Sequence, residues 1–112
     1  MNNREEGISG ETQATEYLKK KGYKIVGRNF SCRQGEIDII AKDKDYLVFV
    51  EVKARENTKF GMPFEAITDG KKRRLTAAAN YYMMTHKCLG CDARFDVVSI
   101  LRGEITHIEN AF

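Results

Sequence analysis

Three ionisable residues, Asp38, Glu51 and Lys53, stand at spacings that could build one metal-dependent site. Side chains two positions apart on a β-strand point to the same face, so Glu51 and Lys53 would lie side by side. If a four-residue loop joins two strands as a hairpin, Lys42 pairs with Leu47, and counting inward sets Asp38 opposite Glu51. The spacing therefore predicts that two carboxylates and one ammonium converge on one patch.

Such a patch predicts phosphodiester hydrolysis. Carboxylates directly opposite each other have Cβ atoms about 5 Å apart and repel unless a cation lies between them. The backbone carbonyl of Val52 could add a third oxygen ligand, and an all-oxygen set suits Mg²⁺ or Mn²⁺ better than zinc. A bound ion would polarise a phosphoryl oxygen and activate water, and the Lys53 ammonium would orient that water or neutralise developing charge.

The elements that position these residues can be read from apolar periodicity and turn residues. Ser9 can cap a helix to about Lys21, and Asp69 can cap a second helix to about His86. Runs rich in β-branched and aromatic residues predict five strands, at 23–30, 35–41, 46–52, 94–101 and 104–108. The order αβββαββ predicts an α/β fold, a mixed sheet flanked by helices. Glu51 interrupts an otherwise apolar strand, where an unpartnered charge would be costly.

Glu11 is the candidate contribution of the first helix. It lies three residues before Ala14 and seven before Leu18, so its carboxylate points toward the apolar side of the helix. It could bind water or a second ion at the metal site. It could equally be a favourable partner for the helix dipole in the first turn.

Basic residues cluster at the start of the second helix. Lys71, Lys72, Arg73 and Arg74 give this segment a local excess of positive charge, against an overall net charge of only +3. Lys71 and Arg74 share the side of the apolar stripe, and we predict phosphate contacts for them and for Arg55 just beyond the hairpin. The alternative is an ordinary solvated helix start.

Length and composition predict one domain over residues 1–112, with residues 1–8 as a flexible start, because 112 residues with 42% hydrophobic content suit a single core. Three cysteines and no long apolar run predict a reduced, cytoplasmic protein. Cys32, Cys88 and Cys91 with His86 match structural zinc spacing poorly, so ordinary thiols are the favoured interpretation.

Several segments also resemble a known pattern. An Asp on one strand followed by (D/E)-x-K on the next resembles the PD-(D/E)xK nuclease superfamily, which includes restriction enzymes and Holliday-junction resolvases. More closely, the chain from Gly10 onward resembles the uncharacterised bacterial YraN-type family. The segments that carry the resemblance are GEIDII, LVFVEVKAR, FGMPFEAIT to KKRRL, RFDVV and HIENAF.

The resemblance implies a restriction-endonuclease-like three-layer core and a Mg²⁺- or Mn²⁺-dependent endonuclease. The substrate would be DNA more than RNA, with branched or structured DNA as candidates, and resolvase-like relatives act as dimers. It assigns Asp38 and Glu51 to metal binding, Lys53 to the attacking water and Glu11 to the glutamate of the first helix.

Two other interpretations remain open from the sequence. The chain could be a catalytically silent nucleic-acid-binding module with the same fold. The acidic cluster could also be purely structural, with Glu36 opposite Lys53 as an ordinary cross-strand ion pair.

Overall fold

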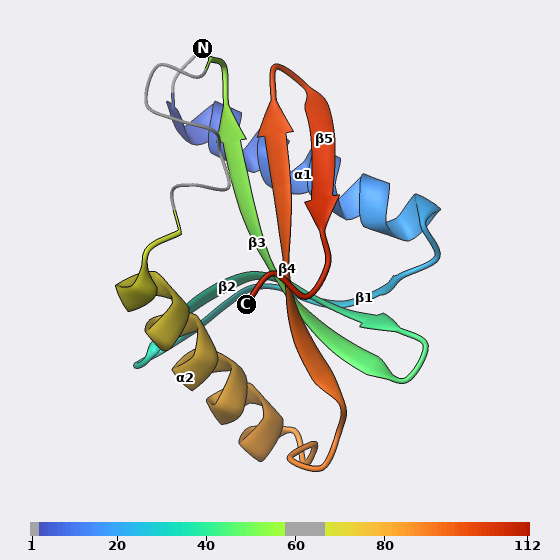
Figure 1. Ribbon diagram of the computed structural model, residues 1–112, viewed down its shortest axis with the longest axis vertical. Helices are drawn as coiled ribbons and strands as arrows, with labels where there is room; N and C mark the ends of the chain where they lie inside the picture. Colours follow the sequence, from blue (N-terminus) through green and yellow to red (C-terminus); the bar gives the residue numbers. More distant parts are fainter. Residues whose placement is uncertain (1–2, 58–66) are drawn as a thin grey trace.

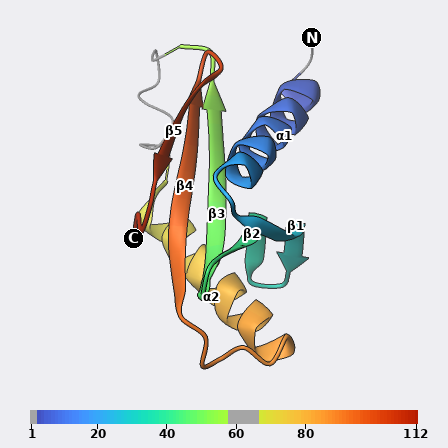
Figure 2. The same ribbon diagram turned by 90° about the vertical axis from the view of Figure 1, so that its right-hand side faces the viewer.

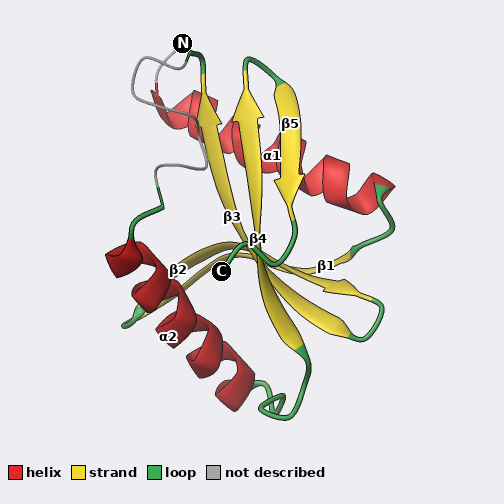
Figure 3. Cartoon of the chain, in the orientation of Figure 1, coloured by secondary structure: helices red, strands yellow, loops and turns green. Residues whose placement is uncertain are grey.

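The structure, a computed structural model, describes the main chain of residues 3–57 and 67–112 and the side chains from residue 10 onward within those ranges (Figures 1 and 3). It confirms the predicted element order. The elements are α1 (Asn3–Lys20), β1 (Lys24–Cys32), β2 (Gly35–Asp43), β3 (Tyr46–Arg55), α2 (Asp69–Thr85), β4 (Ala93–Leu101) and β5 (Glu104–Ile108).

The strands form one open mixed sheet in the order β1-β2-β3-β4-β5. Among the described strands, β3 and β4 form the one parallel pair, and α2 lies between them in the chain, as a parallel crossover requires. The other neighbours are antiparallel. β3 is the middle strand, which explains its apolar sequence, and β1 and β2 turn away from the direction of β3 to β5 (Figures 1 and 2).

One helix covers each face of the sheet. Alternation along β3 sends Val48 and Val50 into the cluster under α1, and Leu47 and Phe49 into the cluster under α2. The α1 cluster also contains Ala14, Leu18, Ile39, Ala41, Val98 and Ile100. The α2 cluster also contains Ile37, Ile40, Leu75, Ala78, Ala79 and Met83. The sequence prediction of a mixed α/β fold flanked by helices is confirmed.

Both predicted helix starts are wrong. α1 begins at Asn3, so Ser9 lies inside the helix and cannot be its N-cap. α2 is capped by Thr68, one residue before Asp69, because Thr68 has extended backbone and its hydroxyl oxygen accepts a hydrogen bond from the Lys71 N–H at 3.1 Å.

The β2–β3 hairpin has a shorter loop than predicted but the predicted register. Asp43 pairs with Tyr46, which leaves a two-residue loop in which Lys44 has a positive φ of 54°. Relative to a four-residue loop, Asp43 joins β2 and Tyr46 joins β3. The pairing of Lys42 with Leu47 is therefore unchanged and is confirmed.

Cys88 and Cys91 form a disulfide in the loop after α2, so the expectation of reduced thiols is wrong for this pair. A disulfide leaves no thiolate at either position to bind zinc. Cys32 is a free, half-buried thiol packed against the α2 cluster. Among the described residues, no helix is long and apolar enough to span a membrane.

Candidate active site

The site lies where β2 and β3 stop pairing. Their ladder ends at Ile39 and Val50, and beyond that pair, in the described chain, β2 pairs only with β1 and β3 only with β4. The Asp38 carboxylate occupies the gap, because its Oδ2 accepts a hydrogen bond from the Val52 N–H at 2.8 Å. The side chain of Asp38 therefore reaches toward β3, as the register predicts.

The backbone of Val52 also faces this gap. The N–H and C=O of one strand residue point to the same side, and the N–H of Val52 points toward Asp38. Its C=O consequently points toward the side where the ladder with β2 has ended, while its side chain packs against the α1 cluster. The carbonyl of Val52 therefore faces the same gap as the Asp38 carboxylate.

Glu51 is the buried centre of the site. Its side chain is 5% exposed and its Oε1 lies 3.7 Å from Lys53 Nζ and 3.3 Å from Lys71 Nζ. Lys53 therefore pairs with Glu51 on its own strand, whereas the structural interpretation expected it to pair with Glu36. The α2 helix supplies the second ammonium, so residues twenty positions apart in sequence meet at one carboxylate.

The surroundings of Glu51 disfavour its charged form, so a nearby positive charge would stabilise the carboxylate. Burial and the negative charge of Asp38 raise the pKa of Glu51, Lys71 and Lys53 lower it, and the net result is a pKa of about 7. A carboxyl group with this pKa is partly protonated at neutral pH. Binding a cation at Glu51 would compete with that proton and favour the anionic form.

Glu11 approaches from the α1 side. Its Oε2 lies 3.7 Å from Arg28 Nη2, and with the Asn29 amide oriented NH₂-inward that group donates to both Glu11 oxygens at 2.9 and 3.1 Å. Burial raises the pKa of Glu11, as does the charge of Asp38, while Arg28 and Asn29 lower it. Because α1 begins at Asn3, Glu11 is beyond the first helical turn, and the dipole interpretation is wrong.

The remaining predicted cations lie in different surroundings. Lys72 Nζ lies 5.6 Å from the centroid of the Phe112 ring. Arg74 lines a hollow of about 240 Å³ with Lys71, next to the β1–β2 turn. Arg55 follows Lys53 on the same face of β3, and its buried Nε has no hydrogen-bond partner among the described residues.

The donor set fits a hard divalent ion. In the part of the chain that the structure describes, no three His, Cys, Asp or Glu side chains form a ready-made cage. The available set is two carboxylates, Asp38 and Glu51, and the carbonyl of Val52. These are all oxygen donors with two negative charges, the chemistry that Mg²⁺ and Mn²⁺ accept.

A second buried polar cluster was missed by sequence reasoning. Asp96 on β4 is fully buried and accepts hydrogen bonds from Arg94 Nε at 3.0 Å and from the Asn110 N–H at 3.0 Å. Its other oxygen lies 2.7 Å from His107 Nε2. Burial raises the pKa of Asp96, but the hydrogen bonds from His107, Arg94 and Asn110 outweigh this and lower it overall.

This cluster ties the end of the chain to the sheet. Lys21 Nζ lies 2.9 Å from His107 Nδ1. Because an ammonium can only donate, Nδ1 is the acceptor, so Nε2 carries the hydrogen and donates a hydrogen bond to Asp96. The ring of Phe112 stacks on Phe95 with centroids 4.8 Å apart. The RFD and HIENAF segments are therefore structural partners. Asp96 in the apolar run RFDVVSIL gave the same signal as Glu51, a carboxylate in a buried strand.

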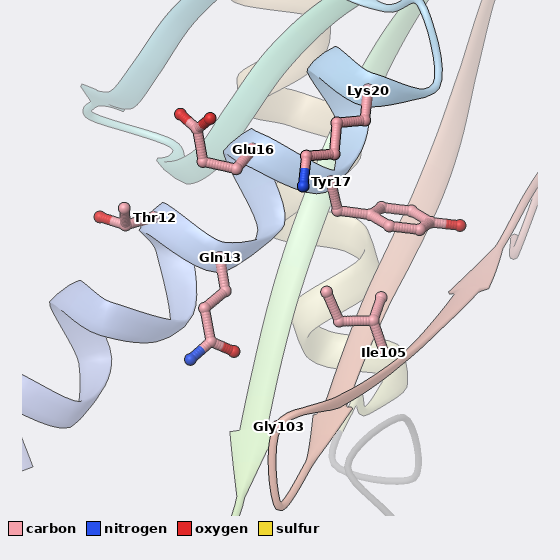
Figure 4. Close-up of a pocket in the computed structure, with 7 residues that line it drawn as sticks. All are labelled: Thr12, Gln13, Glu16, Tyr17, Lys20, Gly103 and Ile105. Carbon is pink, nitrogen blue, oxygen red and sulfur yellow. The ribbon is translucent and has the colours of Figure 1, made fainter.

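A larger hollow of about 540 Å³ lies away from Asp38 and Glu51, between α1 and the β4–β5 turn (Figure 4). Tyr17 and Ile105 face each other across it, with Lys20 beside the ring (Figure 4). It brings no pair of carboxylates together, so its size does not make it the catalytic candidate.

Comparison with known proteins identifies the family. Residues 10–100 match the family described as "Uncharacterised protein family UPF0102". The chain belongs to the UPF0102 family. A UPF0102 protein of Lachnoclostridium phytofermentans is 50% identical over 113 residues, covering 100% of this chain and 96% of the relative. One of Caldicellulosiruptor saccharolyticus is 50% identical over 118 residues and covers both chains completely. The YraN-type resemblance is thereby confirmed.

Proposed function

We propose that this UPF0102 chain is a metal-dependent endonuclease of the PD-(D/E)xK superfamily, with a restriction-endonuclease-like core, that hydrolyses DNA phosphodiester bonds. One observation carries the proposal: the carboxylate of Glu51 is buried beside Asp38 and two ammonium groups at the point where two strands part. The pKa of the structural carboxylate Asp96 is lowered by its hydrogen bonds, whereas that of Glu51 is raised, and this difference supports a site that a cation would complete.

The ligands would be Asp38, Glu51 and the Val52 carbonyl, with Glu11 contributing through water or a second ion. When bound, Mg²⁺ or Mn²⁺ would polarise the phosphoryl oxygen and lower the pKa of a bound water. Asp38 is already held by the Val52 N–H, which leaves its other oxygen free of that bond. Arg28 and Asn29 hold the Glu11 carboxylate in place.

The two lysines would divide the remaining work. An ammonium donates hydrogen bonds and accepts none, so protonated Lys53 would orient the attacking water or stabilise charge on the phosphate instead of removing a proton. Lys71 now serves as a counter-charge for Glu51 at 3.3 Å. Once a cation neutralises Glu51, Lys71 would be able to contact a phosphate oxygen of the substrate. Arg74 and Arg55 would contact neighbouring phosphates of the DNA backbone.

The test is nicking of supercoiled plasmid and cleavage of a four-way DNA junction in Mn²⁺ or Mg²⁺. We expect cleavage by the natural chain and its loss in Asp38→Ala and Lys53→Ala. Lys24→Ala, an exposed cation at the start of β1, is the matched control and should cleave normally.

Two outcomes would reject the proposal in favour of the other interpretations. DNA binding without any metal-dependent cleavage that these substitutions abolish would indicate a catalytically silent binding module. Absence of both cleavage and DNA binding, with the natural chain folded, would indicate a structural cluster.

A further inference from the structure

Two hollows lie beside α2, one of about 240 Å³ at Lys71 and Arg74 and one of about 370 Å³ at Tyr81 and Met84. Together we call them the α2 groove. Arg74 and Tyr81 are seven residues apart, so they lie on the same side of the helix about 10 Å apart. The β1–β2 turn borders both hollows, through Gly35 in the first and Gln34 in the second.

The first hollow is lined by two cations, Lys71 and Arg74, and by one acidic residue, Glu36, so its net charge is positive. Lys71 contacts Glu51 at 3.3 Å and so joins this hollow to the active site. A Cβ at Gly70 would lie 3.5 Å from Arg74 Nη1 and 3.8 Å from Arg73 Nη2, which places both guanidinium groups at the first turn of α2. Neither arginine forms an ion pair with a carboxylate in the described parts of the chain. No described carboxylate is thus paired with either guanidinium group, and a phosphate could contact them.

The second hollow is aromatic and apolar. The Tyr81 side chain is 38% exposed, and its ring is supported by Phe30 at a centroid distance of 6.3 Å. Met84 is 55% exposed at the same hollow. The side-chain amide of Asn80, also at this hollow, can both donate and accept hydrogen bonds. A supported, exposed ring beside amide groups is a surface on which a flat heterocycle can stack.

We propose that this α2 groove binds a single-stranded stretch of DNA leaving the active site, with a phosphate at Lys71 and Arg74 and a base on Tyr81. This inference rests on the proposed nuclease function. Cations followed by an aromatic ring match a phosphate backbone with unstacked bases, because backbone tracking and base stacking are the two components of single-strand binding. The preferred substrate would then carry an unpaired strand next to the cleaved bond, as flaps and branched DNA do.

The experiment measures binding of fluorescein-labelled oligothymidylate by anisotropy in EDTA, so that no catalysis is needed. We expect Tyr81→Ala and Arg74→Ala each to weaken binding about tenfold, and Arg74→Ala to lower the salt dependence by about one phosphate contact. Tyr81→Phe should bind normally because the ring is kept. Tyr46→Ala, an exposed tyrosine on the β2–β3 hairpin, and Lys24→Ala should also bind normally.

Unchanged binding by Tyr81→Ala, or an equal loss in Tyr46→Ala and Lys24→Ala, would overturn the groove. So would sedimentation showing that Tyr81→Ala and Met84→Ala only dissociate a dimer, since the apolar hollow would then be an interface between two copies of the chain. Groove-dependent binding by a chain that never cleaves would leave this inference standing and reject the nuclease. Metal-dependent cleavage with binding indifferent to Tyr81 would do the reverse.

Discussion

Replacing Glu51 by Gln should make the metal-free protein more stable at alkaline pH. Burial and the Asp38 charge raise the pKa of Glu51 from 4.5 to about 7. Between these pH values the folded protein holds a proton that the unfolded chain releases, so stability falls as the pH rises through this interval. A difference of about 2.5 pKa units lowers the free energy of unfolding by roughly 3 kcal/mol in total, and this loss is complete above about pH 7.

Glutamine keeps the shape of the side chain without the buried charge. At pH 8.5 in EDTA we expect Glu51→Gln to be more stable than the natural chain by up to about 3 kcal/mol. At pH 4.5 the two proteins should have nearly equal stability, because Glu51 is protonated in the folded natural chain. Urea unfolding at several pH values measures both differences, with the exposed Glu104→Gln as the matched control.

Metal should reverse the order of stability. A ligand at 1,000 times its dissociation constant stabilises the folded state by about 4.1 kcal/mol, which exceeds the advantage of roughly 3 kcal/mol expected for Glu51→Gln, and Mn²⁺ should do so for the natural chain but not for Glu51→Gln. Two results without metal would contradict a raised pKa for Glu51. One is a Glu51→Gln protein that is less stable than the natural chain at pH 8.5, and the other is a difference in stability that is the same at every pH.

Three further expectations follow from the contacts. Asp96→Ala should lower the free energy of unfolding by about 3–5 kcal/mol in urea titration, because Arg94, His107 and the Asn110 N–H all lose a buried acceptor. As the pKa of Asp96 is lowered, the stability that this residue contributes should be present above the usual Asp range and lost as the pH falls below it. Lys71→Ala removes a charge that lowers the pKa of Glu51, so an NMR titration should place that pKa higher than in the natural chain, and no change would contradict the contact. Glu11→Gln should reduce metal affinity or the cleavage rate about 10- to 100-fold, as loss of a residue that supports the metal ligands does. The free energy of unfolding should change little, because Glu11 is partly exposed. An unaltered metal titration would show that Glu11 is not part of the site.

The hairpin geometry was predictable from the sequence because strand pairing has a period of two. Fixing Lys42 opposite Leu47 also fixed the direction of Asp38 and the shared face of Glu51 and Lys53. The error in loop length did not matter, since Asp43 and Tyr46 pair with each other and the register was preserved.

The start of α1 was not predictable in the same way. Gly7 and Gly10 interrupt residues 3–10, and glycine in a helix interior weakens the helical pattern. In the structure Gly10 has a packing reason, because a Cβ there would lie 3.2 Å from the Ala54 Cβ. This contact between α1 and β3 depends on tertiary structure and leaves no mark in the local sequence.

The contacts of Lys71 and Asp96 depend on pairings between distant segments. Helical periodicity placed Lys71 on the side of the sheet, but its 3.3 Å contact with Glu51 arises from how α2 crosses the sheet. The Asp96 cluster joins β4, β5 and the end of α1, and no local spacing connects His107 or Lys21 to Asp96.

Calorimetric titration with Mn²⁺ at pH 8 measures whether Asp38 and Glu51 bind a divalent metal ion. We expect saturable binding by the natural chain that is lost in both Asp38→Ala and Glu51→Gln and retained in Glu104→Gln. No heat at millimolar Mn²⁺ from the folded natural chain, or binding that survives both substitutions, would contradict a metal site between Asp38 and Glu51.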